Sequence, residues 1–402
     1  MIAFGTVEDR MRTFVGILAV LIGLAGPGMA KSEVSVSMTY LRVEQPETPT
    51  LSNLDLPPGD LGAAGALLGL ADNVTTGAFL GQGYHLDIVS VPEGEDPLAA
   101  ARAALSEVPF LILDAPAETL TAIADLPEAR SALLFNVSSG AASLRDNGCR
   151  ANLLHTAPSD AMRADALMQF LVTRRWTDLA LISGTHDRDV TFAEALRKST
   201  EKFQLRLRAE KTWAFDADMR RNASQEVPLF TQDLPEHDVL LIADEIGDFG
   251  RYIPFNTWEP RPVGGSEGIR PVTWSRVVEQ WGAAQLQSRF MESAGRDMRS
   301  MDYAAWAAVR AIGEAVTRTG SGDVGELRAY MLSEEFELAG FKGRPLSFRS
   351  WNGQLRQPIP LVHESAVVAM APFEWFLHAE NELDTLGLDR PESGCEVMDP
   401  RT

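Results

Sequence analysis

Short apolar runs separated by polar breaks recur along most of the chain. These runs are too short for helices and end in polar loops, which is typical of buried strands in a parallel sheet. The runs that predict strands are 86–91, 110–113, 133–135, 152–156, 179–182 and 239–243. Strands are also predicted at 34–40, where apolar and polar residues alternate, and at 205–213. Between them, apolar side chains recur at spacings of three and four, as at Ala164, Leu167, Met168 and Leu171, which predicts amphipathic helices. This alternation favours an α/β fold with parallel sheets and right-handed crossovers.

Helix boundary signals agree with this alternation. Ser159 occupies an N-cap position before one helical pattern, and Asp96 followed by Pro97 opens another, as helix N-termini prefer. Gly320 follows the helical pattern over 303–319 and predicts its end.

The second half is less regular. Residues 246–274 predict a long irregular segment, and apolar runs at 345–350 and 358–363 predict strands flanking an Asn352-Gly353 turn. The polar residues beyond Glu380 are expected to lie on the surface.

The N-terminus has the features of an export signal. Arg10 and Arg12 precede an apolar run over 14–25, and residues 28–30 read Gly-Met-Ala, a small-x-small cleavage site. We expect cleavage after Ala30 and a periplasmic protein, with translation starting at Met1 or Met11. The alternative is an N-terminal membrane anchor.

Charge and cysteine content narrow the possible partners and crosslinks. The formal net charge of −20 argues against nucleic acid and anionic membranes as partners. An exported chain meets an oxidising compartment, so the two cysteines, Cys149 and Cys395, predict a disulfide. The alternative is two free thiols.

The motifs for enzymatic chemistry are weak. Residues 264–268 match GxSxG, but the neighbouring Pro262 and Pro271 argue against the strand and helix that a nucleophile elbow needs, so Ser266 is expected in a plain loop. The six histidines form neither an HExxH motif nor an i, i+4 pair. We therefore expect no metal, no cofactor and no enzymatic activity, and only His186, in a loop after a strand, is a candidate ligand contact.

Polar loops at the predicted strand ends are the remaining functional signal. They lie at 114–116, 136–140, 183–187 and 244–245. Because open α/β sheets bind ligands beyond the carboxyl ends of their strands, these loops predict a cleft for a small polar ligand.

Over roughly residues 62–372, the sequence resembles a known protein family. The matching passages are Asn136-Val137-Ser138-Ser139 with Cys149 and 153–160, the helical passage 303–323, and 341–354 with its Asn352-Gly353-Gln354 turn. They resemble the periplasmic substrate-binding proteins of ABC importers, type I fold, of the branched-chain amino acid (Leu/Ile/Val-binding) group. The chain is most similar to a divergent subgroup associated with pyrroloquinoline-quinone (PQQ) dependent alcohol dehydrogenase systems.

The resemblance implies a domain organisation. After the signal peptide, 1–30, two Rossmann-like lobes with parallel central sheets are joined by a three-strand hinge. The N-terminal lobe comprises 31–154 and 277–357, the C-terminal lobe comprises 155–276 and 358–380, and a tail follows at 381–402.

The resemblance also implies the ligand contacts. In the first lobe these are Asp114, Ala115, Asn136, Ser138 and Ser139. In the second lobe they are Ser183, Thr185, His186, Asp244 and Glu245, with Asp244 or Glu245 as the acid that holds a ligand ammonium. Asp114-Ala115-Pro116 departs from the glycine- and serine-rich loop of the family, and an acid there would repel a ligand carboxylate.

The implied function is capture of a small polar solute in an interlobe cleft by hinge closure. A monomeric protein would deliver the solute to an ABC permease in the inner membrane, and the resemblance to the PQQ-associated subgroup implies a connection with PQQ-dependent alcohol oxidation. The alternative is a periplasmic sensor, or an accessory protein of a quinoprotein dehydrogenase with no transport role.

Overall fold

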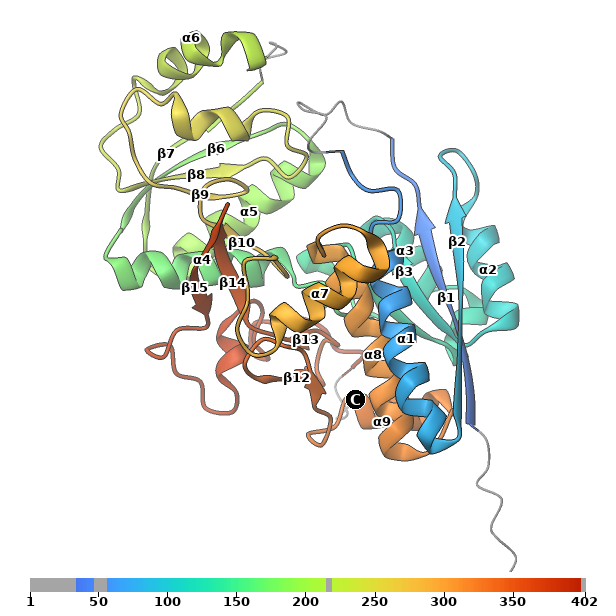
Figure 1. Cartoon of the computed structure of the whole chain (residues 1–402). Coiled ribbons are helices and arrows are strands. Elements are labelled where there is room, and N and C mark those ends of the chain that lie inside the picture. Colours follow the sequence, from blue (N-terminus) through green and yellow to red (C-terminus); the bar gives the residue numbers. More distant parts are fainter. Residues whose placement is uncertain (1–33, 47–55, 215–218, 399–402) are drawn as a thin grey trace, which may run out of the picture. The chain divides into compact units, whose positions relative to one another are not determined.

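The computed structural model describes residues 34–46, 56–214 and 219–398. The predicted signal peptide therefore lies outside the described residues. Within them, two parallel sheets form the framework (Figure 1), which confirms the predicted α/β class.

The first sheet has the strand order β2-β1-β3-β4-β5, and all its neighbouring strands are parallel. Its strands are β1 (Val34–Val43), β2 (Gln82–Val91), β3 (Phe110–Asp114), β4 (Leu133–Asn136) and β5 (Leu153–His155). Alternate side chains of the inner strands enter two separate apolar clusters, one on each face. Both faces are therefore buried, which explains the continuous apolar runs in the sequence.

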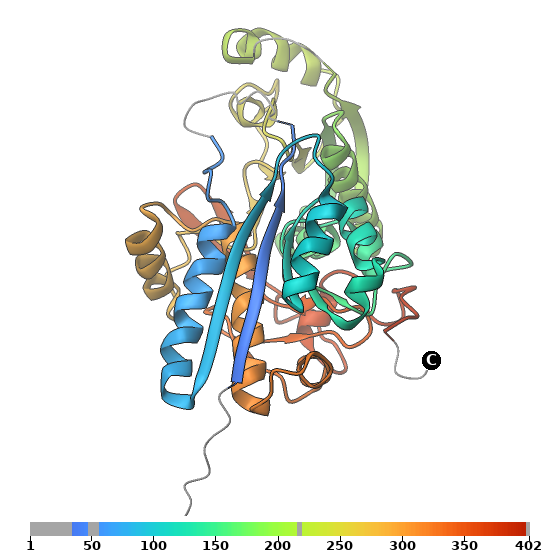
Figure 2. The same cartoon turned by 90° about the vertical axis from the view of Figure 1, so that its right-hand side faces the viewer.

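Helices cover both faces of this sheet. Figure 2 shows α1 (Ala63–Leu80) and α8 (Ser300–Thr319) on one face and α2 (Pro97–Glu107) and α3 (Ala117–Ala124) on the other. Helix α1 is long and apolar enough to cross a membrane by composition alone. It instead packs closely on α8, because a Cβ at Gly65 would lie only 1.9 Å from the Asp302 carbonyl oxygen.

The second sheet has the order β7-β6-β8-β9 and is also parallel. Its strands are β6 (Asp178–Ser183), β7 (Arg206–Thr212), β8 (Val239–Ala243) and β9 (Val263–Gly265), and its helices are α4 (Asp160–Arg174), α5 (Asp187–Lys202) and α6 (Met219–Thr231). Helix α4 begins as predicted, because the Ser159 hydroxyl accepts a hydrogen bond from the Met162 N–H at 3.1 Å.

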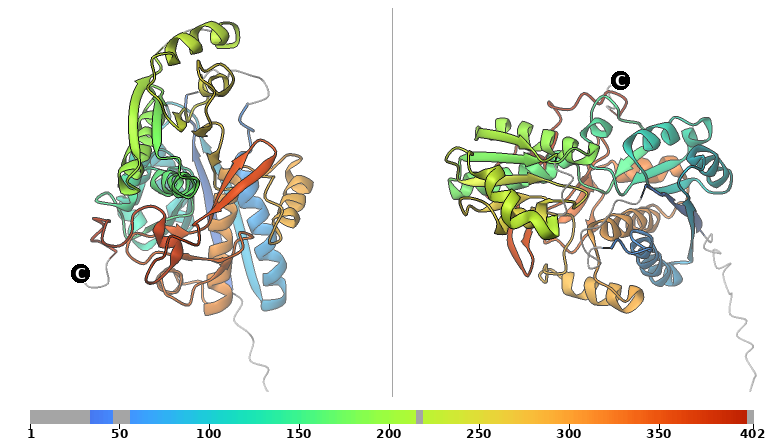
Figure 3. Two further views of the ribbon diagram at one scale, coloured as in Figure 1. Left: turned by 90° about the vertical axis from the view of Figure 1, so that its left-hand side faces the viewer. Right: turned by 90° about the horizontal axis from the view of Figure 1, so that it is seen from above.

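Two small antiparallel sheets complete the described elements. One contains β11 (Leu338–Ala339), β12 (Pro345–Phe348) and β13 (Leu355–Arg356), and its apolar residues join a core cluster of the first sheet. The other contains β10 (Arg270–Pro271), β14 (Ile359–His363) and β15 (Ala366–Ala371), and it packs with α4. Helices α7 (Ala283–Ala294) and α9 (Val324–Met331) lie on either side of α8 in the sequence. The β14–β15 hairpin and α7 can be followed in Figure 3.

Three predictions about the second half need correction. The Asn352-Gly353 turn joins β12 to β13, whereas β14 pairs with β15, because two apolar runs in sequence do not determine which strand each one pairs with. The segment 246–274 is not wholly irregular, since it contains the 3-10 helix η3 (Gly250–Phe255), β9 and β10.

The third correction concerns residues 381–398, which do not lie wholly on the surface as expected for the tail beyond Glu380. This segment contains the 3-10 helix η4 (Glu382–Thr385), and Leu383, Asp384 and Leu386 are buried. The predicted disulfide between Cys149 and Cys395 is present. We call residues 381–398 the C-terminal segment.

Candidate functional site

The predicted contact residues lie at the carboxyl edges of the two parallel sheets. In the first sheet Leu113 of β3 is in register with Asn136 of β4. In the second sheet Ser183 of β6 is in register with Ala243 of β8, and Ile242 with Gly265 of β9. The loops that follow each set of strands are therefore neighbours. Ser266, which follows β9, joins the second group, although the sequence indicated only a plain loop there.

The loops of the first sheet are tied to one another by hydrogen bonds. The Ser138 hydroxyl accepts a hydrogen bond from the Ala115 N–H at 3.0 Å. The Asn136 side-chain oxygen accepts from the Ser138 and Ser139 N–H groups at 3.2 and 2.9 Å, and its amide donates to the Ser139 carbonyl at 2.8 Å. The structure thus brings these four predicted residues together, and Asn136 shapes the loop.

Asp114 is engaged in a separate contact. Its carboxylate accepts from the Arg42 Nε at 3.1 Å and from the Tyr40 hydroxyl at 3.3 Å. Burial raises the pKa of Asp114, and the Arg42 guanidinium opposes that shift. Because Arg42 already balances its charge, Asp114 repels a nearby ligand carboxylate less than the sequence suggested.

Asp244 organises the loop after β8. Its two carboxylate oxygens accept hydrogen bonds from the backbone N–H groups of Gly247, Asp248, Phe249 and Gly250, at 2.5 to 3.1 Å. A Cβ at Gly250 would lie 2.8 Å from one of these oxygens, so the close approach requires glycine. Asp244 therefore has its acceptor capacity occupied by the protein itself.

Glu245 is held in a half-buried ion pair that the sequence did not predict. Arg163 of α4 donates to both of its carboxylate oxygens, at 2.7 and 2.9 Å, and the Ser266 hydroxyl donates at 2.8 Å. Burial alone would raise the pKa of Glu245, but the Arg163 guanidinium outweighs this effect and the pKa is lowered. The Arg163 guanidinium thus occupies the Glu245 carboxylate, which was one of the two acids predicted to hold a ligand ammonium.

Ser183, Thr185 and His186 differ in their exposure. Ser183 is buried, whereas Thr185 and His186 are exposed in the loop before α5. The His186 Nε2 lies 3.5 Å from a carboxylate oxygen of Asp248, and its side chain is 49% exposed. Among the predicted contacts in the second sheet, Thr185 and His186 are therefore the ones open to a ligand.

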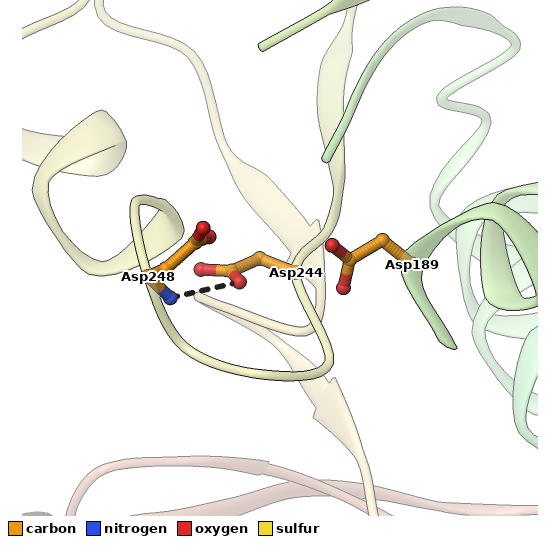
Figure 4. Close-up of side chains that lie close together, drawn as sticks. All are labelled: Asp189, Asp244 and Asp248. Carbon is orange, nitrogen blue, oxygen red and sulfur yellow. Dashed lines mark hydrogen bonds between the residues drawn. The ribbon is translucent and has the colours of Figure 1, made fainter. Parts of the chain in front are cut away.

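Three aspartates gather beside this loop. Figure 4 shows Asp244 between Asp189 of α5 and Asp248, and one carboxylate oxygen of each lies within 4.8 Å of the others. Asp189 accepts from the Glu245 N–H at 2.6 Å and the His186 N–H at 3.3 Å. Because N–H groups already engage the oxygens of Asp189 and Asp244, the cluster is not an open cation site. The expectation of no metal stays a prediction.

The cluster makes stability depend on pH. Burial and the neighbouring carboxylates of Asp244 and Asp189 raise the pKa of Asp248 to about 6. Between about pH 4 and 6 the folded protein therefore retains a proton that the unfolded chain loses, so the free energy of unfolding falls as pH rises through this range. We expect Asp248→Asn to be more stable than wild type at pH 7, by about 1 kcal/mol after allowance for solvent screening, and equal to it at pH 4.

Urea unfolding midpoints at pH 4 and pH 7 test this prediction. Glu364→Gln, which alters an exposed carboxylate in the β14–β15 turn, is the control and should leave the pH dependence unchanged. A lower stability of Asp248→Asn than of wild type at pH 7 would contradict the prediction.

Comparison with known proteins shows which proteins share this fold. No family model matches the chain, and no curated protein matches it. A branched-chain amino acid ABC transporter periplasmic ligand-binding protein from Burkholderia xenovorans superposes with a TM-score of 0.69 at 15% identity, covering 90% of this chain and 99% of that one. A leucine-, isoleucine-, valine-, threonine- and alanine-binding protein from Brucella ovis gives 0.66 at 12% identity, covering 85% and 94%.

A third structure extends the comparison. It is an ABC transporter solute-binding protein from R. palustris in complex with benzoate, which gives a TM-score of 0.62 at 13% identity and covers 90% of this chain and 99% of that one. All three are solute-binding proteins, and each aligns over at least 94% of its own length. The chain therefore has the periplasmic binding protein type I fold, the fold of the branched-chain amino acid-binding proteins of ABC importers.

Proposed function

We propose that this protein is a periplasmic solute-binding protein that captures a small polar solute and delivers it to an ABC permease. The observation that carries the proposal is the match of nearly the whole fold to solute-binding proteins, together with polar loops at the carboxyl edges of both parallel sheets. The solute would bind between an N-terminal lobe, 31–154 and 277–357, and a C-terminal lobe, 155–276 and 358–380, and hinge closure would complete its contacts. It is not an enzyme in this proposal, and it acts as a monomer.

The predicted contacts favour a solute other than an α-amino acid. A ligand ammonium needs a free carboxylate, but Arg163 pairs with Glu245, and backbone N–H groups surround Asp244. The hydroxyl and imidazole of Thr185 and His186 suit a neutral or anionic polar group instead. A connection with PQQ-dependent alcohol oxidation rests on the sequence resemblance, so alcohols, aldehydes and carboxylates are the first candidates.

Thermal unfolding with candidate ligands tests this function. The protein is purified from the periplasm as the cell processes it and is scanned with amino acids, short alcohols, aldehydes, carboxylates and PQQ. A ligand at about one hundred times its dissociation constant adds roughly 2.7 kcal/mol to the free energy of unfolding. We expect a saturable rise of a few degrees in Tm with one chemical class, and its loss in Thr185→Val, which alters an exposed side chain of the proposed site.

The second candidate is an accessory or sensor protein of a quinoprotein dehydrogenase system. It is favoured by the same internal pairing of Glu245 with Arg163, because a cleft whose acids are already balanced does not require a charged solute. Absence of any Tm shift across the panel, with co-purification of a dehydrogenase, would favour this candidate over transport.

A further inference from the structure

A pocket of about 450 Å³ lies outside the strand-end loops. It is bordered by residues before α7, by the loop before β12, and by the segment that ends β15 and follows it. Its lining residues are Trp281, Lys342, Gly343, Arg344, Pro358, Met370, Ala371, Pro372, Phe373, Glu374 and Trp375. None of them belongs to the proposed solute site, so this pocket requires its own explanation.

Lys342 is the unusual group in this pocket. The residue is 2% exposed, yet no carboxylate among the described residues forms an ion pair with it. Its ammonium donates to the Gln357 side-chain oxygen at 2.6 Å and to the Pro358 carbonyl at 3.3 Å, and it lies 4.4 Å from the centre of the Tyr303 ring. Burial lowers the pKa of Lys342 well below its usual value.

A buried ammonium without a counter-ion is energetically unfavourable, and lysine side chains are rarely buried unless they are paired. Its two hydrogen bonds use two of its three N–H groups. An anion in the pocket would supply the missing charge, which neither the two neutral acceptors nor the Tyr303 ring provides. Arg344 adds a second cation at the border, where it is paired with Glu382. Glu374 is the carboxylate among the lining residues, and it is exposed to solvent that screens its charge.

The remaining lining is aromatic and apolar. Trp281 and Trp375 are 49% and 80% exposed, which is unusual for side chains of this size. Met370, Phe373 and two prolines add further apolar surface. Aromatic linings favour flat apolar ligand bodies.

The backbone is arranged to place Trp281 in this pocket. Trp281 has a φ of 54°, a conformation that non-glycine residues adopt at a cost and that recurs at ligand sites. A Cβ at Gly343 would lie 2.7 Å from the Trp281 ring, so the indole packs directly on the Gly343 backbone. Phe341, next to Lys342, has a φ of 55°. Two of the three border segments thus contain a non-glycine residue with a positive φ at or beside the pocket.

We propose that this pocket is a second ligand site, which binds an organic anion with a flat apolar body. The anionic group is held by Lys342, with Arg344 at the border, and the body lies against Trp281 and Trp375. The pocket is lined by residues of both proposed lobes, but it shares no residue with the strand-end loops that form the proposed solute site.

Isothermal titration calorimetry with 2-naphthoate tests the proposal, and the neutral isostere 2-naphthamide is the control ligand. We expect saturable binding of one naphthoate per protein and binding of the amide at least tenfold weaker. Lys342→Met keeps most of the stem but removes the ammonium, and should weaken naphthoate binding at least tenfold. Trp375→Ala truncates an exposed side chain, so the fold is retained, and should weaken it severalfold.

Trp258→Ala is the matched control variant. Trp258 is 61% exposed and lies outside the pocket, so this variant should bind naphthoate as wild type does. Absence of saturable binding to wild type would overturn the proposal. So would equal affinity in wild type, Lys342→Met and Trp375→Ala, because the probe would then bind elsewhere, including the solute cleft. Either result leaves the proposed solute-binding function untouched.

Discussion

Replacement of Asp384 with asparagine is expected to lower the free energy of unfolding by about 3–5 kcal/mol. Asp384 lies in the C-terminal segment with a fully buried side chain, and it accepts hydrogen bonds from Arg349 at 2.8 Å and Arg356 at 2.8 and 3.0 Å. The Arg349 side chain is 1% exposed. Asparagine would leave two arginines without their shared counter-charge, one of them fully buried, and that is the costly way to break a buried ion pair. Urea unfolding monitored by circular dichroism measures the loss.

A neighbouring ion pair provides the control. Glu382, which lies two residues before Asp384, forms an ion pair with Arg344. The side chains of Glu382 and Arg344 are 42% and 43% exposed. Because exposed pairs contribute little, Glu382→Gln should cost less than about 1 kcal/mol. If Asp384→Asn cost as little as Glu382→Gln, the C-terminal segment would not be part of the cooperative fold.

The sequence pattern is sufficient to predict most of the two parallel sheets. Strands buried on both faces appear as continuous apolar runs, and β8 is predicted at its observed bounds, Val239–Ala243. The signals at Ser159 and Gly320 also mark real helix ends, since Ser159 caps α4 and Gly320 has a φ of 67° after α8. These features depend on residues close in sequence, so local patterns suffice.

Elements that depend on distant partners were missed. Helix α6 is polar and contains Pro228, so its sequence does not resemble a helix. Strand β15 is apolar but mostly exposed or half-buried, and its pairing with β14 is not visible in the local sequence. The C-terminal segment is polar in sequence, but its residues Asp384 and Cys395 are buried because Arg349 and Cys149 lie against them in the fold. No local pattern contains that information.

The candidate site also combines features that local sequence predicts with features that depend on distant residues. The positions of its loops were predicted because they follow apolar strands, and parallel pairing brings strand ends together. The state of their side chains was not predicted, because Glu245 is paired with Arg163, which lies 82 residues away. Ser266 could have been identified as a residue directly after a strand, had β9 been recognised in its glycine-rich sequence. The site boundaries and the ligand contacts stay predictions.

Loss of the Cys149–Cys395 disulfide is expected to lower the free energy of unfolding by roughly 3–5 kcal/mol, because the bond joins residues 246 positions apart and restricts the unfolded chain. The double variant Cys149→Ser, Cys395→Ser should show this loss in urea and should not respond to dithiothreitol. Reduction should bring wild type to the same midpoint. An unchanged midpoint in both cases would contradict the expectation.

Combining the Cys149→Ser, Cys395→Ser double variant with Asp384→Asn tests whether the C-terminal segment acts as one cooperative unit. The segment contacts the loop after β4 through Cys395, and it contacts helices α4 and α5 through Gly387, whose N–H donates to Asp165 at 2.8 Å, and Glu392, which pairs with Lys202 at 3.0 Å. If either change alone detaches the segment from the rest of the fold, the second change removes fewer remaining contacts. The combined decrease in the free energy of unfolding is then smaller than the sum of the two separate decreases. Fully additive losses would instead mean that the disulfide and the Asp384 cluster stabilise the fold independently.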